Sequence, residues 1–314
     1  MDVSMTHATE TRKRAPLPLR LAMAGMALLT AATPSAAQSA AAEDSESGPI
    51  AQATYRAVYD LELLRASQKT GINAAEGRIV MEIRGNACSG WTSQTRMVVA
   101  MHFRRRGTRL TDSRDTAWES ANGNVFRYAA VRYVNGIKSE DYRLTALRTT
   151  PKGPVKLRFS KPRRDPRTLP PGTLFPMQAT ARLIAAGREG RHRLAFPIYE
   201  GYEDGEAREV VAAISSPLTK PSQDPGTKAL AGLASWHVSL AYYRPRMRRG
   251  FGLPEYEVIF RLFENGAVSD VVLDYGDYAL KGTLVRYTPL PETPCEKVEA
   301  PSEEKPPRPL PSLE

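Results

Sequence analysis

The sequence has little of the material from which metal centres and disulfide frameworks are built. Two cysteines and four histidines in 314 residues exclude a disulfide-rich mini-scaffold and a cysteine-ligated zinc site. No histidine has a second histidine or a carboxylate at the spacing of metal ligands. We therefore expect neither a metal nor a cofactor.

The signatures of common enzymes are also missing. The sequence has no G-x-S-x-G elbow, no P-loop and no G-x-G-x-x-G fingerprint. The acidic stretch 200–206 lacks the ligand spacing of a calcium loop, and a hairpin turn is the favoured interpretation. A protein without enzymatic activity is predicted, and a hydrolase is the less favoured alternative.

No apolar run reaches the roughly 18 residues of a transmembrane helix, but the N-terminus has the features of an export signal. A basic stretch at 12–14 is followed by an apolar run from Leu21 to Ala32 and by small residues up to Ala37. This order predicts a cleavable secretory signal peptide over residues 1–37. Residues 38–49 are mostly small or acidic and predict a flexible leader.

Export changes the interpretation of the two cysteines, Cys88 and Cys295. An isolated pair in an oxidising compartment is most simply one disulfide. A bridge across so long a loop would contribute about 5 kcal/mol in the chain-entropy account. A cysteine nucleophile is the alternative, but Cys295 stands in a proline-rich segment that supports catalysis poorly.

Basic residues exceed acidic ones, with 44 lysine and arginine against 34 aspartate and glutamate. They form runs at Arg104–Arg106, Arg158–Arg167 and Arg244–Arg249. Since an exported protein does not normally meet nucleic acid, we expect these runs to face anionic lipid or polymer. A solvated basic face is the alternative.

Most of the chain shows the period-two alternation of β-strands. In Tyr55–Leu63, apolar and aromatic residues alternate with charged ones, and Trp91–Phe103 repeats the pattern. Asn135-Gly136 and Asn265-Gly266 predict hairpin turns, because Asn-Gly tolerates positive φ. Further strands are predicted over 79–83, 155–159, 193–199, 208–214, 236–243, 256–263, 269–275 and 282–287.

One stretch, Leu174 to Ala186, has helical spacing. Pro176 near its start and Gly187 after its end are typical of helix boundaries. Arg182 is its only charged residue, so we expect the sheet to cover this helix.

We predict a single mainly antiparallel β domain over residues 50–297, with the helix packed on or in it, and a proline-rich disordered tail over 298–314. Curved sheets of this length close on themselves or enclose a cavity. Aromatic residues gather in the β segments, and we predict that some line a ligand cavity. Ordinary core packing is the alternative for each of these candidates: Trp91, Trp118, Phe126, Tyr128, Trp236, Tyr242, Phe260 and Tyr278.

Three motifs together resemble the EipB-like family of exported alphaproteobacterial cell-envelope integrity proteins. The first begins with Tyr59-Asp60-Leu61-Glu62-Leu63 and continues through Gly77-Arg78 to Cys88-Ser89-Gly90-Trp91-Thr92. The second is Phe175-Pro176, which opens the predicted helix. The third runs from Tyr256 as YEVIFRLFENGAVSDVVLDYGDYALKGTLVRY and closes with Cys295.

The resemblance implies a periplasmic β-spiral, an antiparallel sheet curled around one helix, with an architecture like that of LolA, LolB and RseB. It also implies that Cys88 and Cys295 correspond to the family's cysteine pair, that loss of the protein is associated with sensitivity to envelope stress, and that a periplasmic tetratricopeptide-repeat protein is a partner. The favoured function is maintenance of the cell envelope by binding a lipid, lipoprotein or peptide in the cavity. The alternative is a protein-interaction scaffold with a filled core.

Overall fold

The computed structural model describes residues 52–245, 252–292 and 294–295. The predicted signal peptide, leader and tail lie outside the described residues, as does the basic run beyond Pro245. No helix among the residues that the structure describes combines the length and apolar character needed to cross a bilayer.

The described chain folds into one antiparallel sheet of fourteen strands, in the order β8-β7-β6-β5-β4-β3-β2-β1-β14-β13-β12-β11-β10-β9. The strands β1 to β8 are Tyr55–Ala66, Ile72–Asn86, Gly90–Phe103, Gly107–Glu119, Val125–Val134, Ile137–Arg148, Val155–Lys161 and Arg167–Leu169. The strands β9 to β14 are Arg193–Ile198, Arg208–Ile214, Ser235–Tyr243, Tyr256–Phe263, Val268–Asp274 and Tyr278–Pro289. The mainly β prediction is confirmed.

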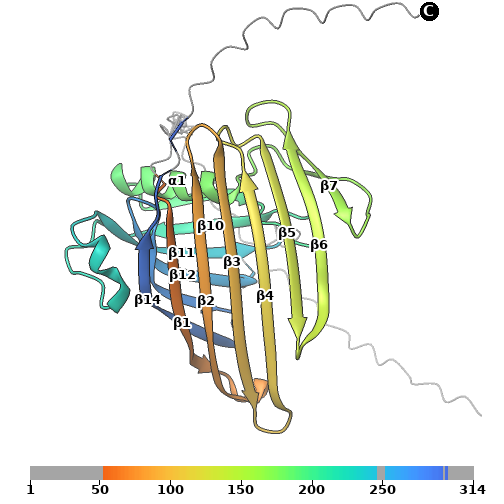
Figure 1. Cartoon of the computed structure of the whole chain (residues 1–314), viewed down its shortest axis with the longest axis vertical. Coiled ribbons are helices and arrows are strands. Elements are labelled where there is room, and N and C mark those ends of the chain that lie inside the picture. Colours follow the sequence, from red (N-terminus) through yellow and green to blue (C-terminus); the bar gives the residue numbers. More distant parts are fainter. Residues whose placement is uncertain (1–51, 246–251, 293, 296–314) are drawn as a thin grey trace, which may run out of the picture. The chain divides into compact units, whose positions relative to one another are not determined.

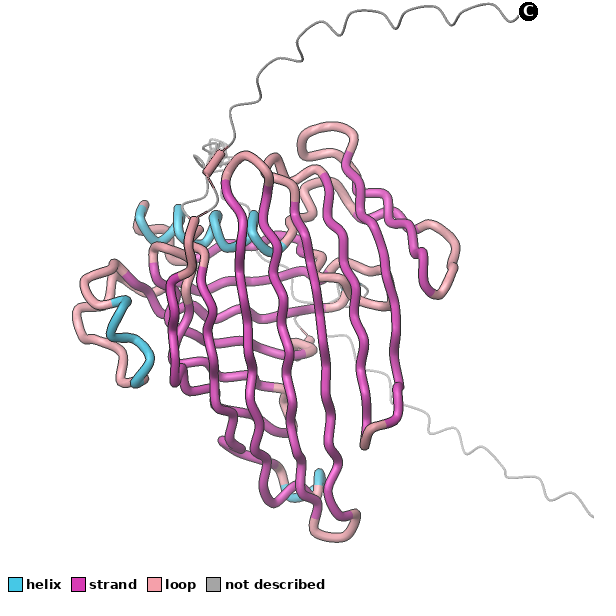
Figure 2. The backbone as a smooth tube through the Cα atoms, viewed as in Figure 1, coloured by secondary structure: helices cyan, strands magenta, loops and turns pink. Residues whose placement is uncertain are grey.

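The sheet curls so that its two halves face each other. Figure 1 shows β2 to β6 as a front layer of long strands, with β10, β11 and β12 crossing behind it and α1 (Pro176–Arg188) near the upper end. Figure 2 shows the same two layers in the backbone trace. The predicted sheet curled around one helix is therefore confirmed, with two short 3-10 helices in addition, η1 (Gln68–Thr70) and η2 (Pro225–Leu230).

Both favoured hairpin turns form where the sequence places them. Asn135 and Gly136 have φ of 50° and 79° and join β5 to β6 in two residues, as a type I′ turn requires. Gly266, with φ of 82°, lies in the turn between β12 and β13. Strand β4 was not predicted as a strand, and its residues line the region described below.

Helix α1 is covered, as predicted, and its apolar side chains belong to the largest core cluster. Leu183 and Ile184 are 3% and 6% exposed, and they share this cluster with side chains from both halves of the sheet. A Cβ on Gly187 would approach the ring of Trp236 to 2.7 Å, so glycine permits close packing of the helix against β11.

A carboxylate from the front layer holds the start of α1. Glu119 Oε2 accepts a hydrogen bond of 2.9 Å from the amide of Met177, and Oε1 accepts one of 3.2 Å from Gln178. Both amides belong to the first turn of the helix, where N–H groups have no partner within the helix itself. Burial raises the pKa of Glu119 to about 7, against the lowering effect of both hydrogen bonds and of the Arg148 charge.

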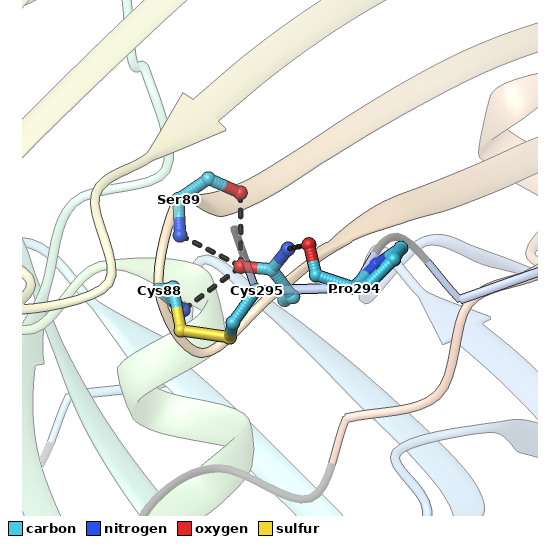
Figure 3. Close-up of a disulfide and its surroundings, with 5 residues drawn as sticks. Cys88, Ser89, Pro294 and Cys295 are labelled. Atoms are coloured by element: carbon cyan, nitrogen blue, oxygen red, sulfur yellow. Dashed lines mark hydrogen bonds between the residues drawn. A yellow bond between two sulfur atoms is a disulfide. The ribbon is translucent and has the colours of Figure 1, made fainter. Parts of the chain in front are cut away.

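The disulfide joins Cys88, in the turn between β2 and β3, to Cys295 after β14, with a Cα–Cα distance of 5.7 Å. Asn86 Oδ1 accepts hydrogen bonds from the amides of Cys88 and Ser89, at 2.8 and 2.7 Å, and Figure 3 shows the disulfide beside them. The predicted bridge is confirmed, and it uses both thiols that the nucleophile alternative required.

Candidate functional site

The candidate site lies on the inner face of the curled sheet, the face that carries Tyr59 and Trp91 and contacts α1. Residues directly opposite each other in an antiparallel pair share a face. Ile79 pairs with Met97, and Met97 pairs with Ser113. These three side chains therefore continue the inner face from β2 across β3 to β4.

Near α1 this inner face is sealed. Trp91, Trp236 and Tyr242 are 5%, 2% and 4% exposed, and Phe126 is 1% exposed. These side chains pack into two core clusters, one that contains side chains of α1 itself and one that contains Phe175 directly before it.

Away from α1 the inner face carries a small third core cluster, and the side chains packed around that cluster are only half-buried. We call this region the open half and define it by eight inner-face side chains of intermediate exposure, together with the adjacent Arg132 and Tyr275. Its members are Thr95, Met97, Met101, Ser113, Asp115, Tyr256, Leu273 and Tyr278. The methionine and leucine side chains here pack against that cluster and keep part of their surface accessible to solvent.

Tyrosines line the open half on β12 and around the β13–β14 turn. The Tyr242 and Tyr256 rings stack at 4.3 Å between centroids, and the Tyr275 and Tyr278 rings stack at 4.9 Å. Tyr256 also lies 6.4 Å from Tyr275. These four tyrosine rings thus form a continuous row from the sealed core to the outer end of the open half.

A hydrogen-bonded chain of hydroxyls ends on Glu200. Tyr202 donates to Glu200 Oε2 at 2.7 Å. Because that uses the proton of Tyr202, the 2.7 Å contact between the Tyr256 and Tyr202 hydroxyls has Tyr256 as donor. Desolvation raises the pKa of Glu200, and its hydrogen bonds from Tyr202 and Tyr242 oppose that shift.

The facing strands β4, β5 and β6 contribute polar groups. Tyr128 donates to Asp115 Oδ1 at 2.8 Å, while burial raises the pKa of Asp115 despite that bond. Arg132 pairs with Glu140 at 2.7 Å and contacts Ser113 Oγ at 3.3 Å. The open half therefore combines apolar side chains with hydroxyl and charged groups.

The aromatic residues predicted from the sequence do not form one site. Trp91, Trp236, Tyr242 and Phe260 belong to the sealed cluster around α1, whereas Tyr128 packs beside the second cluster and reaches Asp115. Trp118 lies on the other face of β4, with the Arg127 guanidinium 5.0 Å from its ring.

Sequence reasoning missed Tyr202, Tyr256 and Tyr275. The alternation of Tyr256, Val258 and Phe260 along β12 was a usable signal, because it places Tyr256 on the same face as Phe260.

The basic runs lie apart from one another. Arg163, Arg164 and Arg167 line a surface pocket of about 430 Å³ with Phe159, Asp165, Glu203 and Asp204. Arg104–Arg106 line another of about 370 Å³ at the β3–β4 turn. Arg244 pairs with Glu255, and the rest of its run lies outside the described residues. No group of three metal-binding side chains occurs within the described ranges.

These features define a β-barrel-like protein, one curled antiparallel sheet closed over a helix and tied by a disulfide. A crystal structure of a β-barrel-like protein of a domain of unknown function from Brucella abortus has this architecture. It superimposes with a TM-score of 0.71 at 28% identity, over 76% of this chain and 99% of that one.

The model of the EipB-like family matches residues 46–291, and the chain belongs to that family. A relative named cell envelope integrity protein EipB, from Brucella abortus (strain 2308), is 32% identical over 235 residues. The match covers 74% of this chain and 82% of that protein.

Proposed function

We propose that this chain is a non-enzymatic periplasmic protein that supports cell-envelope integrity by holding the apolar part of an amphipathic molecule in the open half. The name of the Brucella relative supports the cellular role. The observation that carries the binding role is the half-buried inner face, on which Met97, Met101 and Leu273 remain partly exposed between two layers of protein.

The lining suits an acyl chain or an extended peptide with apolar side chains. Each square ångström of apolar surface removed from water contributes about 25 cal/mol. Methionine adapts its shape to irregular partners, and the tyrosine hydroxyls offer hydrogen bonds to the polar part of the ligand. A ligand with an apolar part and a polar part would contact both kinds of side chain in the open half.

The acidic groups in the open half and at its border favour binding over hydrolysis. Glu200 and Asp115 accept hydrogen bonds from Tyr202 and Tyr128. Burial and the neighbouring carboxylates raise the pKa of both tyrosines well above their usual range. These phenols therefore keep their protons and donate them to the two carboxylates, so both carboxylates are already engaged by the protein's own groups.

The test is to purify the protein from its own periplasm and measure its mass by native mass spectrometry. We expect a co-purifying molecule that is released on denaturation. Met97→Trp, which fills the open half, should reduce binding of an environment-sensitive apolar dye at least tenfold.

The matched control is Val98→Trp, one residue along β3 on the outer face, where Val98 pairs with Arg78 and Asp112. This variant should bind the dye like the wild type. An empty protein, together with equal dye binding by both variants, would overturn the proposal and leave the scaffold function in its place.

A further inference from the structure

Two turns at the end of the sheet far from α1 form a basic surface that the function proposed above does not explain. We call it the cationic tip and define it as Lys69 of η1 with Arg104, Arg105, Arg106 and Arg109 of the β3–β4 turn and β4. Figure 2 shows η1 as the short helical stretch beside this turn at the lower end of the view. The pocket of about 370 Å³ lies here, lined by Gln68, Lys69, Thr70, Gly71, Phe103 and Arg104–Arg106.

The backbone fixes the two turns to each other. The amide of Arg104 donates to the carbonyl of Gly71 at 2.9 Å. Gly71 and Gly107 have φ of 70° and 72°, the left-handed region that side chains disfavour. His102 Nδ1 lies 2.9 Å from Thr108 Oγ1 across the base of the β3–β4 hairpin. The pocket therefore has a defined backbone frame.

The charges of the tip are poorly balanced. Lys69 pairs with Asp277 at 2.7 Å. Arg104, Arg105 and Arg106 are exposed, and among the described residues no carboxylate forms an ion pair with them. Clustered guanidinium groups repel one another, and a bound anion would relieve that repulsion.

The tip adjoins the outer end of the open half. Arg109 pairs with Met101 across the hairpin, so both lie on the inner face. The charge of Arg109 partly offsets the burial that raises the pKa of Tyr278. Asp277, the partner of Lys69, stands next to Tyr278 in the sequence. A polar group at the tip and an apolar chain in the open half could belong to one molecule.

We propose that the cationic tip binds the phosphate of an anionic lipid head group whose acyl chains occupy the open half. The proposal rests on the function proposed above for its apolar part. Arginine forms paired hydrogen bonds with phosphate oxygens, and the pocket places three arginines beside a lysine.

The test measures calorimetric binding of two short-chain lipids below their micelle concentrations, dihexanoylphosphatidylglycerol and dihexanoylphosphatidylcholine. We expect the wild type to prefer the anionic lipid at least tenfold. The variant Arg104→Gln/Arg105→Gln/Arg106→Gln should bind that lipid roughly 100-fold more weakly, at about fivefold for each cation, and should bind the zwitterionic lipid unchanged.

The matched control, Arg143→Gln/Lys156→Gln/Arg158→Gln, removes the same charge from exposed positions on β6 and β7. It should weaken binding less than threefold. Equal losses in both triple variants would reduce the effect to net charge and overturn the proposal. Inorganic phosphate that binds as tightly as the lipid would also overturn it, because the site would then be one for free phosphate.

The apolar dye separates this proposal from the one on which it rests. If Met97→Trp leaves dye binding intact while the tip variant still loses affinity for the anionic lipid, the proposed apolar site in the open half is wrong and the proposed anion site at the cationic tip is supported. If dye binding falls in Met97→Trp but the tip variant binds both lipids like the wild type, the proposed anion site is wrong and the proposed apolar site is supported.

Discussion

At the scale of single residues, buried ionisable groups mark where the fold is sensitive to pH. Glu119 is 3% exposed and lies against the amides of Met177 and Gln178. Arg148, 6% exposed, donates to the carbonyl of Thr173 and stacks over Phe175. Both residues hold the segment from Thr173 to Gln178 in place at the start of α1.

The raised pKa of Glu119 predicts a stability that falls with pH. The folded protein keeps a proton on this carboxyl up to about pH 7, whereas the unfolded chain loses it near its ordinary value of about 4.3. The contribution of this proton to the free energy of unfolding is therefore fully present below the unfolded-state pKa of about 4.3 and is lost as pH rises through about 7. The stability lost over this pH range is on the order of 3 kcal/mol.

Chemical denaturation between pH 4 and 8 measures this loss, and Glu119→Gln should flatten the profile. Glu62→Gln, at an exposed position, should retain the wild-type slope. A Glu119→Gln profile that matches the wild type would contradict the assignment.

At the scale of elements, α1 is the support on which both halves of the sheet pack. Ile184→Asp should destabilise the protein by about 4 kcal/mol or more, because an unpaired carboxylate would enter the core. Ala185→Asp places the same charge one position away, where exposure is intermediate, and should cost much less. Thermal melting of the two variants compares them, and a wild-type melting temperature for Ile184→Asp would show the packing to be wrong.

The strands that could be predicted are those whose inner face is apolar. In β1 the alternation of Tyr55, Ala57 and Tyr59 follows burial, and each is 3% exposed or less. Strand β4 gave no such signal, since its inner face carries Thr111, Ser113 and Asp115 towards the open half. Polar lining removes the apolar alternation on which strand prediction depends.

The candidate site itself was beyond prediction because residues distant in sequence build it. The pairing of Tyr202 with Tyr256 depends on how β9 to β12 curl, which no local pattern encodes. The curl was expected only from the family resemblance. The disulfide, by contrast, followed from the count of cysteines in a chain whose N-terminus predicts export.

At the scale of the whole molecule, the Cys88–Cys295 bridge closes a loop of 207 positions. Cys88→Ser should lower the melting temperature, with a loss of up to about 5 kcal/mol in the chain-entropy account. Dye and lipid binding should persist in the folded variant at low temperature. Scanning calorimetry with and without reductant measures the effect, and a reduced wild type that melts unchanged would contradict it.

The position of β14 beside β1 has a consequence for how the chain acquires its structure during synthesis. Strand β1 can pair with β2 as soon as β2 is synthesised. Its other edge stays unpaired until β14 has been synthesised. Until then β1 presents unpaired amides and carbonyls, a template for association with other chains. Synthesis thus passes through an interval in which a nearly complete sheet lacks the β1–β14 pairing at its centre, and folding in that interval depends on how soon β14 follows.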